Sequence, residues 1–551
     1  RSVRCRDARG SDGEPMTRRK TSRPPSVFVV ASSVLALLCL TPIVYVFVRA
    51  SGVGVGGGVG DALEVAFSAS SYRLIGRSLA LAVVVSVASV AVSLALAFLT
   101  TVTDMPARRF WTVLSVAPLS VPCYVGATSL LAASSPRGLL GMAWEWIGGE
   151  GALVMRGFVP AALVLTAFAY PYAYLPIRAG FLRLDRSTIE ASRALGKGRF
   201  ATVTRVAFPQ LVPSILTGSL LVCLYTLSEF GAVSLLRYDT FTRVIYQQYT
   251  NAFDRTSAAV SSAMLILVVL AILAAFEFVT PGHARSSDGV STKARPLRVR
   301  LGRWRYASAA LPLVIALVTV VGPVATLGVW YARSLGMEAF GASLSEQFAS
   351  SALFGLGASV VCVLFAAPVG YLVVRHRGFL VVVVERLSFV GFALPGIVVA
   401  LGLAFFALGV KGWPGFGWVY QSVAMLIGAY VVLFVPQAIG SARAGLVRVP
   451  RSLEEAARSL GKPPARVFAT VTMPLAGPSV LAGALLVFIS AIKELPATLL
   501  LAPTGTSTLA TTVWRHMEDA SYARASAPAL LLIGLSSLAV GLIVARERAA
   551  G

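Results

Sequence analysis

The sequence has 551 residues, of which 56% are hydrophobic and 13% charged, and its formal net charge is +24. A soluble chain of this length does not have this composition, and apolar runs of about 20 residues, enough to cross a bilayer as helix, recur along it. A transmembrane barrel would instead show alternating segments of about ten residues. We therefore expect an all-α polytopic membrane protein.

The apolar runs predict twelve membrane spans separated by short polar loops. In chain order they are 27–48, 76–102, 112–133, 158–178, 213–236, 257–280, 306–332, 350–374, 386–410, 419–440, 478–502 and 526–545.

The distribution of basic residues indicates which loops face the cytoplasm. With the N-terminus assigned to the cytoplasm, most of the 48 Lys and Arg residues fall in cytoplasmic loops, as the positive-inside rule requires. Both termini are then cytoplasmic. The net charge therefore does not indicate a nucleic-acid partner.

The N-terminal segment predicts where the protein starts, and the cysteines and histidines bear on disulfides and metal binding. The stretch "RSVRCRDARGSDGEP" precedes Met16, which is the expected true start of a cytoplasmic tail over residues 1–26, and the first span is interpreted as an anchor. The five cysteines form no C-x-x-C motif and the three histidines lie far apart. We therefore expect neither a disulfide framework nor a metal site.

The chain repeats itself. A shift of 265 residues places Pro171 on Pro436, and a shift of 273 places Pro122 on Pro395. Six spans in each half give the halves the same orientation, so they are parallel repeats. The predicted halves are residues 27–280 and 306–551, and the polar, then basic, segment 281–305 joins them as a cytoplasmic linker.

One polar stretch occurs in both halves: "IEASRALGKGRFATVTRVAFP" and "EEAARSLGKPPARVFATVTMP". The pairs Ser187–Glu190 and Ser452–Glu455 predict a capping box at a helix start. Gly461 is suited to the left-handed turn that ends a helix. Each copy therefore predicts two short helices around a glycine turn.

The second copy places Leu453, Ala456, Ala457 and Leu460 on one helix face, at i, i+3, i+4 and i+7 spacing. A face with two adjacent alanines suits the groove of a partner protein. A helix resting on lipid is the alternative for a single copy. Two copies at matching positions favour a two-fold partner.

This repeated stretch resembles the signature loop of ABC-type importer permeases. The matching positions in the two copies are Glu190, Ala191, Ser192, Gly196, Pro209, Glu455, Ala456, Ala457, Gly461 and Pro474. In that family the loop forms a coupling helix that docks into a cleft of the ATP-hydrolysing subunit. Ser192 replaces the second alanine of the pattern.

The resemblance implies the type I importer fold in a bacterial cell membrane, with permease cores over about 73–278 and 348–543. It also implies two ATPase subunits and one extracytoplasmic binding protein as partners, besides membrane lipid. The sequence has no Walker-type phosphate loop, since Lys197 is followed by Gly198 and Lys462 by Pro463. The chain is thus expected to be no enzyme and to bind no cofactor, with ATP used by a partner.

A twelve-helix secondary transporter of the major-facilitator kind is the alternative class. Its marker is a basic loop opened by glycine between helices two and three. The corresponding loops here, "TVTDMPARRF" and "RHRGFLVVVVER", match it poorly.

Two acids lie inside predicted spans, Glu229 in "YTLSEFGAVSLL" and Glu494 in "AIKELPATLLL", and they are equivalent under the 265 shift. Ionisable residues within a membrane are candidates for the transport pathway, where two carboxylates would favour a cation. They could equally be acids that serve helix packing or hydrogen bonding. Lys493 could be a partner for an acid.

The cargo is indicated by a second resemblance. "GAVSLLRYDTFTRVIYQQYTNAFDR", "KELPATLLLAPTGTSTLATTVW" and "YPYAYLPIRAGF" look like the ferric-iron importer permeases, including their fused twelve-span form. Fused thiamine permeases share the architecture, as do relatives for phosphonates, spermidine and sulfate. In the iron family an external binding protein captures the ion and the permease passes it on.

Overall fold

The computed structural model describes residues 26–52, 59–150, 153–184, 186–252, 254–279, 299–335, 341–376 and 378–550. The expected start at Met16 and residues 281–298 of the predicted linker lie outside them. The regular elements within the described residues are all helical. In the first half they are α1 (Ser26–Ala50), α2 (Val59–Ala66), α3 (Ala69–Val102), α4 (Arg108–Val116), η1 (Ala117–Ser120), α5 (Cys123–Ser134), α6 (Leu139–Trp146), α7 (Phe158–Arg183), α8 (Arg186–Ala194), α9 (Arg199–Thr202), η2 (Val203–Ala207), α10 (Phe208–Ser228), α11 (Gly231–Leu235), α12 (Phe241–Thr250) and α13 (Arg255–Val279).

The second half repeats this order. Its elements are η4 (Gly302–Trp304), η5 (Ala307–Ala309), α14 (Ala310–Ala316), η6 (Leu317–Val321), α15 (Gly322–Ser334), α16 (Gly341–Arg375), α17 (Phe379–Val390), η7 (Gly391–Ala393), α18 (Gly396–Val410), α19 (Val423–Val447), α20 (Arg451–Ser459), α21 (Pro464–Val467), η8 (Phe468–Thr472), α22 (Met473–Lys493), α23 (Pro496–Leu501), α24 (Leu509–Glu518) and α25 (Tyr522–Ala550).

The described residues contain ten helices long and apolar enough to span a membrane, and up to twelve if each of two bent pairs is one span. The higher count agrees with the twelve predicted spans. Two of these were wrongly predicted as continuous, because 112–133 and 386–410 fall on the pairs bent by 88° and 113°.

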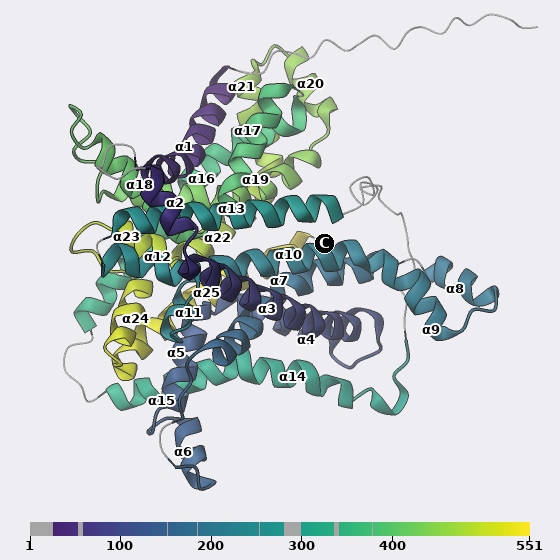
Figure 1. Cartoon of the computed structure of the whole chain (residues 1–551). Coiled ribbons are helices and arrows are strands. Elements are labelled where there is room, and N and C mark those ends of the chain that lie inside the picture. Colours follow the sequence, from purple (N-terminus) through teal and green to yellow (C-terminus); the bar gives the residue numbers. More distant parts are fainter. Residues whose placement is uncertain are drawn as a thin grey trace, which may run out of the picture.

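Three long helices form the core of each half. In the first half α3, α7 and α10 pack together, and in the second half α16, α19 and α22 do so (Figure 1). Small residues allow the close approach. A Cβ added at Gly218 would lie 2.9 Å from the Ala173 Cα, and one at the equivalent Gly483 would lie 2.8 Å from the Ser441 Cβ.

The first helix of each half also reaches across to the other half. Helix α1 packs against α16, α17 and α18, and α15 packs against α5. A Cβ on Gly402 of α18 would lie 2.2 Å from the Pro42 carbonyl oxygen of α1, so these backbones touch. The two halves are therefore interlocked.

The end of the predicted linker is bound to the first half. The Val299 amide donates to the Val102 carbonyl at 2.8 Å, and the Leu301 amide donates to Asp104 Oδ1 at 2.9 Å. Arg305 Nε donates to the Asp104 carbonyl at 3.1 Å. Residues 299–305 thus attach the second half to the loop after α3.

Candidate functional site

Proline breaks two of the spans at equivalent places. Pro122 and Pro395 precede α5 and α18 with φ of −60° in both cases. The residues before them, Val121 and Leu394, are extended, at ψ 117° and 131°. A proline disfavours helical backbone in the residue before it and supplies no N–H, so neither helix can continue.

The two acids mark two further breaks. Glu229 follows α10 and Glu494 follows α22, with extended ψ of 129° and 119°. Their placement inside continuous spans was therefore wrong: the predicted spans 213–236 and 478–502 each end as a long helix at the acid. A short helix follows each acid.

Each carboxylate binds the short helix that follows it. Glu229 Oε1 accepts a hydrogen bond from the Ala232 amide at 3.0 Å, and Glu494 Oε1 accepts one from the Ala497 amide at 3.3 Å. The free amides at a helix start attract negative charge. The expected equivalence of the two acids is confirmed in geometry, and both serve hydrogen bonding.

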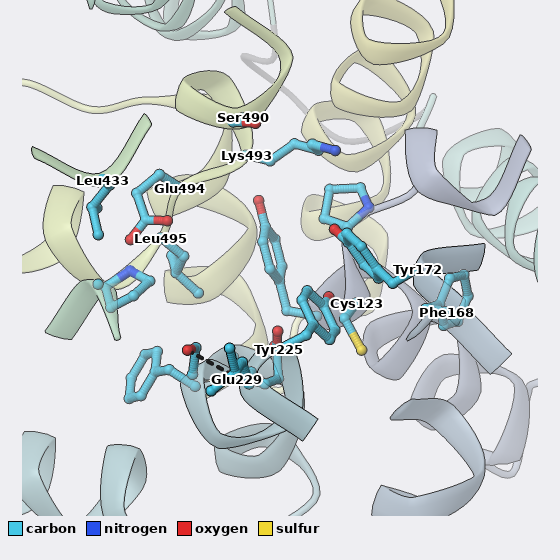
Figure 2. A pocket seen from close by; sticks show the side chains of 18 of the residues that line it. Cys123, Phe168, Tyr172, Tyr225, Glu229, Leu433, Ser490, Lys493, Glu494 and Leu495 are labelled. Atoms are coloured by element: carbon cyan, nitrogen blue, oxygen red, sulfur yellow. Dashed lines mark hydrogen bonds between the residues drawn. The ribbon is translucent and has the colours of Figure 1, made fainter. Parts of the chain in front are cut away.

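The four breaks meet at one cavity of about 250 Å³ between the halves (Figure 2). Irregular backbone at membrane depth is tolerated where it lines a cavity, and broken helices of this kind hold the substrate sites of many transporters. Glu229, Glu494 and Lys493 all line it.

The two walls of the cavity differ chemically. The first half contributes Tyr172 and Tyr225, whose rings stack with centroids 4.8 Å apart. The second half has Gln437 and Ser490 at the matching positions, and Ser490 Oγ donates to Gln437 Oε1 at 3.0 Å. At these matched positions the first half is therefore aromatic and the second half polar.

The repeated stretches form two further candidate sites. Helices α8 and α9 flank Gly196 at φ +77°, and α20 and α21 flank Gly461 at φ +80°. The predicted left-handed turns are confirmed. Figure 1 shows both helix pairs at the edge of the molecule away from α23 and α24.

The signature residues have mixed exposure. Glu190, Ala191, Glu455 and Ala456 are exposed, whereas Ser192 and Ala457 are buried. Ser192 Oγ lies 3.3 Å from Thr202 Oγ1 of the next short helix. The prediction that Ala456 and Ala457 share an exposed face was wrong, because Ala457 packs inward.

Pro209 and Pro474 lie in the first turn of α10 and α22, where a missing N–H costs nothing. Each short stretch runs into its long helix through five residues of π-helix, η2 or η8. The second short helix of each copy is therefore continuous with the long helix that follows it.

The capping boxes were also wrong. Helix α20 begins at Arg451, its N-cap is Pro450, and no side chain caps it, so Ser452 lies within the helix. Helix α8 begins at Arg186, which places Ser187 within that helix too. Proline at the N-cap fixes an extended entry without a side-chain bond.

Sequence reasoning missed Glu454. Its Oε1 lies 3.0 Å from Arg375 Nη2 in a buried ion pair and accepts a hydrogen bond from Thr472 Oγ1 at 3.0 Å. Arg375 also donates to the Val449 carbonyl at 2.8 Å. The signal available in the sequence was the apolar Ile189 at the matching position of the first copy, and Ile189 is buried in the structure.

The fold and these sites define a membrane permease made of two like halves, with a cavity between them and a surface loop repeated in each half. The family model described as "Binding-protein-dependent transport system inner membrane component" matches residues 96–282 and 359–549. The matches cover more than half of the chain, one in each half. The chain therefore belongs to this family of ABC importer permeases, and the secondary-transporter alternative is wrong.

The individual relatives that the chain resembles are also permeases of transport systems. The chain is 31% identical over 528 residues to an "Fe(3+)-transport system permease protein FbpB 2" of Haemophilus influenzae, covering 95% of this chain and 98% of the relative. It is 25% identical over 493 residues to the "Ferric transport system permease protein FbpB" of Actinobacillus pleuropneumoniae, covering 84% and 69%. A "Probable sulfate transport system permease protein cysT" of Helicosporidium is 26% identical over 161 residues, covering 28% and 58%.

These findings show a multi-pass inner-membrane permease subunit of a binding-protein-dependent importer, which is not itself a catalytic enzyme. Such a subunit works with an ATPase and a substrate-binding protein.

Proposed function

We propose that the chain forms the complete membrane pathway for ferric iron. The observation that carries this is the likeness over 95% of the chain to a permease named for Fe(3+) transport. The cavity is consistent with it, because two carboxylates at equivalent positions favour a cation, and hard cations take oxygen ligands.

The doubled loop supports two ATPase subunits, one on each exposed helix pair, and one extracytoplasmic binding protein that delivers the ion. Site residues in this proposal are Glu190, Ala191, Gly196, Glu455, Ala456 and Gly461 for docking, with Ser192, Ala457, Pro209 and Pro474 holding the loops in place. ATP is bound by the partners, and both termini face the cytoplasm, the side on which the loops meet the ATPases.

Thiamine is the second candidate. The stacked Tyr172 and Tyr225 rings offer an aromatic face, and an organic cation gains from such a face. Phosphonate and sulfate are anions and fit a cavity with two carboxylates less well. Spermidine is also an organic cation and gains from the same face, but unlike thiamine it has no aromatic ring to stack on it.

Uptake of radiolabelled iron in a strain lacking this chain tests the proposal, with radiolabelled thiamine as the comparison. We expect iron uptake to depend on the chain and thiamine uptake not to. The reverse result would replace iron by thiamine.

A further inference from the structure

A carbonyl oxygen in the cavity wall lacks its usual backbone donor. Residues Ala117–Ser120 form a 3₁₀ turn, in which each carbonyl accepts from the amide three residues on. The residue three beyond Leu119 is Pro122, which has no N–H. The break therefore leaves the Leu119 oxygen available to another donor.

Lys493 supplies that donor from the other half. Its Nζ lies 2.8 Å from the Leu119 oxygen, a contact between residues 374 positions apart. Within the described residues, no carboxylate lies within the 4.0 Å of an ion pair with Lys493. The side chains of Lys493 and Glu494 point in different directions (Figure 2). The ammonium is thus held on a neutral oxygen in a cavity that is also lined by two carboxylates, which it does not touch.

The matching position of the first half lacks this cation. There Ser228 stands in place of Lys493, and its Oγ donates to the Leu224 carbonyl of its own helix at 2.8 Å. The cavity therefore holds two symmetry-related carboxylates but a single ammonium. A purely structural contact between the breaks could use any donor; a full positive charge at this point acts on every ion that enters.

We propose that Lys493 is a tethered cation that occupies the cavity between transport events. It competes with the cargo cation for the oxygen atoms that line the cavity. Cargo entry displaces the ammonium from the Leu119 oxygen, and its return after release repels a second ion. This rests on the proposed function only in that the cargo is a cation. Lys493 is accordingly a specificity residue.

Three variants separate charge from hydrogen bonding. Lys493→Met removes both, Lys493→Gln keeps a donor without charge, and Lys493→Arg keeps both. The whole chain with its ATPase is reconstituted in vesicles that contain a chelator, and radiolabelled iron is supplied on its binding protein, with and without internal ATP. Thermal unfolding and the amount of bound ATPase control for folding.

We expect Lys493→Met and Lys493→Gln to raise iron entry without ATP at least tenfold, because the repulsion between two unit charges at about 10 Å and an effective dielectric constant of about 20 already corresponds to roughly that factor, and ferric iron carries three charges. Lys493→Arg should remain at the wild-type level. If Lys493→Gln behaves as wild type, the hydrogen bond and not the charge matters, and the proposal is overturned. It is overturned as well if no variant raises entry, or if Lys493→Met and Lys493→Gln lose ATP-driven uptake, since Lys493 would then assist the cargo.

Vesicles that contain the wild-type chain and its ATPase test the identity of the cargo separately. If they take up thiamine and no iron, the proposed function fails, and the same variant pattern measured with thiamine supports the tethered cation. Uptake of sulfate or phosphonate in their place overturns both, because an ammonium would attract those ions.

Discussion

Arg375 at the end of α16 and Glu454 in α20 form a buried ion pair, with Nη2 and Oε1 3.0 Å apart and side chains 9% and 5% exposed. The matching positions in the first half are Val102 and Ile189, which are also buried. The matching positions in the long helix and the surface loop are thus charged in one half and apolar in the other.

This comparison predicts the outcome of a double-mutant cycle. Arg375→Val alone leaves the Glu454 carboxylate buried without its partner and should cost about 3–5 kcal/mol of stability. Arg375→Val with Glu454→Ile copies the first half and should cost clearly less. Thermal unfolding of the purified chain measures both, and a double variant no more stable than the single one would contradict the apolar equivalence.

The glycine turn of the second loop should be needed for coupling and not for folding. Gly461→Val places a β-branched residue at φ +80°, which costs roughly 1 kcal/mol or more. We expect iron uptake and ATPase binding to fail while the amount of protein in the membrane is unchanged.

Gly477→Val is a matched control for this substitution. Both glycines have open space where a Cβ would stand, but Gly477 lies within α22 without a positive φ. Normal uptake by Gly461→Val, or equal loss in both variants, would refute a requirement for the left-handed turn.

The two cavity acids should be required for iron passage. Glu229→Gln with Glu494→Gln keeps side-chain size and an oxygen that can accept from the Ala232 and Ala497 amides, and removes only the charges. We expect iron transport to be abolished while ATPase docking and ATP hydrolysis persist, since the barrier for a multivalent cation rises by roughly several kcal/mol. Initial uptake rates at equal membrane abundance measure this.

Glu385→Gln is the control for loss of a carboxylate elsewhere. Glu385 pairs with Arg443 at 2.8 Å with both side chains partly exposed, and it does not line the cavity. Iron uptake by the Glu385→Gln variant should equal iron uptake by the wild-type chain. Unimpaired uptake by the double cavity variant would leave the two acids with a helix-capping role alone.

The number of ATPase subunits follows from the doubled loop. Each half presents an exposed helix pair, so one chain should bind two ATPase copies. Native mass spectrometry of the complex purified with its ATPase partner determines the ratio. A ratio of one ATPase per chain would show that a single loop docks.

The sequence by itself determined the membrane class, the positions of the apolar segments and the two-fold repeat. These follow from apolar run length and from matched residues, which need no knowledge of distant contacts. The left-handed turns at Gly196 and Gly461 were also predictable, because few residues other than glycine favour that conformation. The equivalence of Glu229 and Glu494 could be derived from the repeat, because the two halves can be aligned without knowledge of distant contacts.

The tertiary structure alone decided where the spans break and what faces inward. A proline or acid in an apolar run is compatible with both a kinked and a broken helix, and only packing against the other half selects one. Burial of Glu454 depends on Arg375, 79 residues away, and the bond from Lys493 to Leu119 joins opposite halves. Such pairings are set by three-dimensional proximity, which local pattern and propensity do not encode.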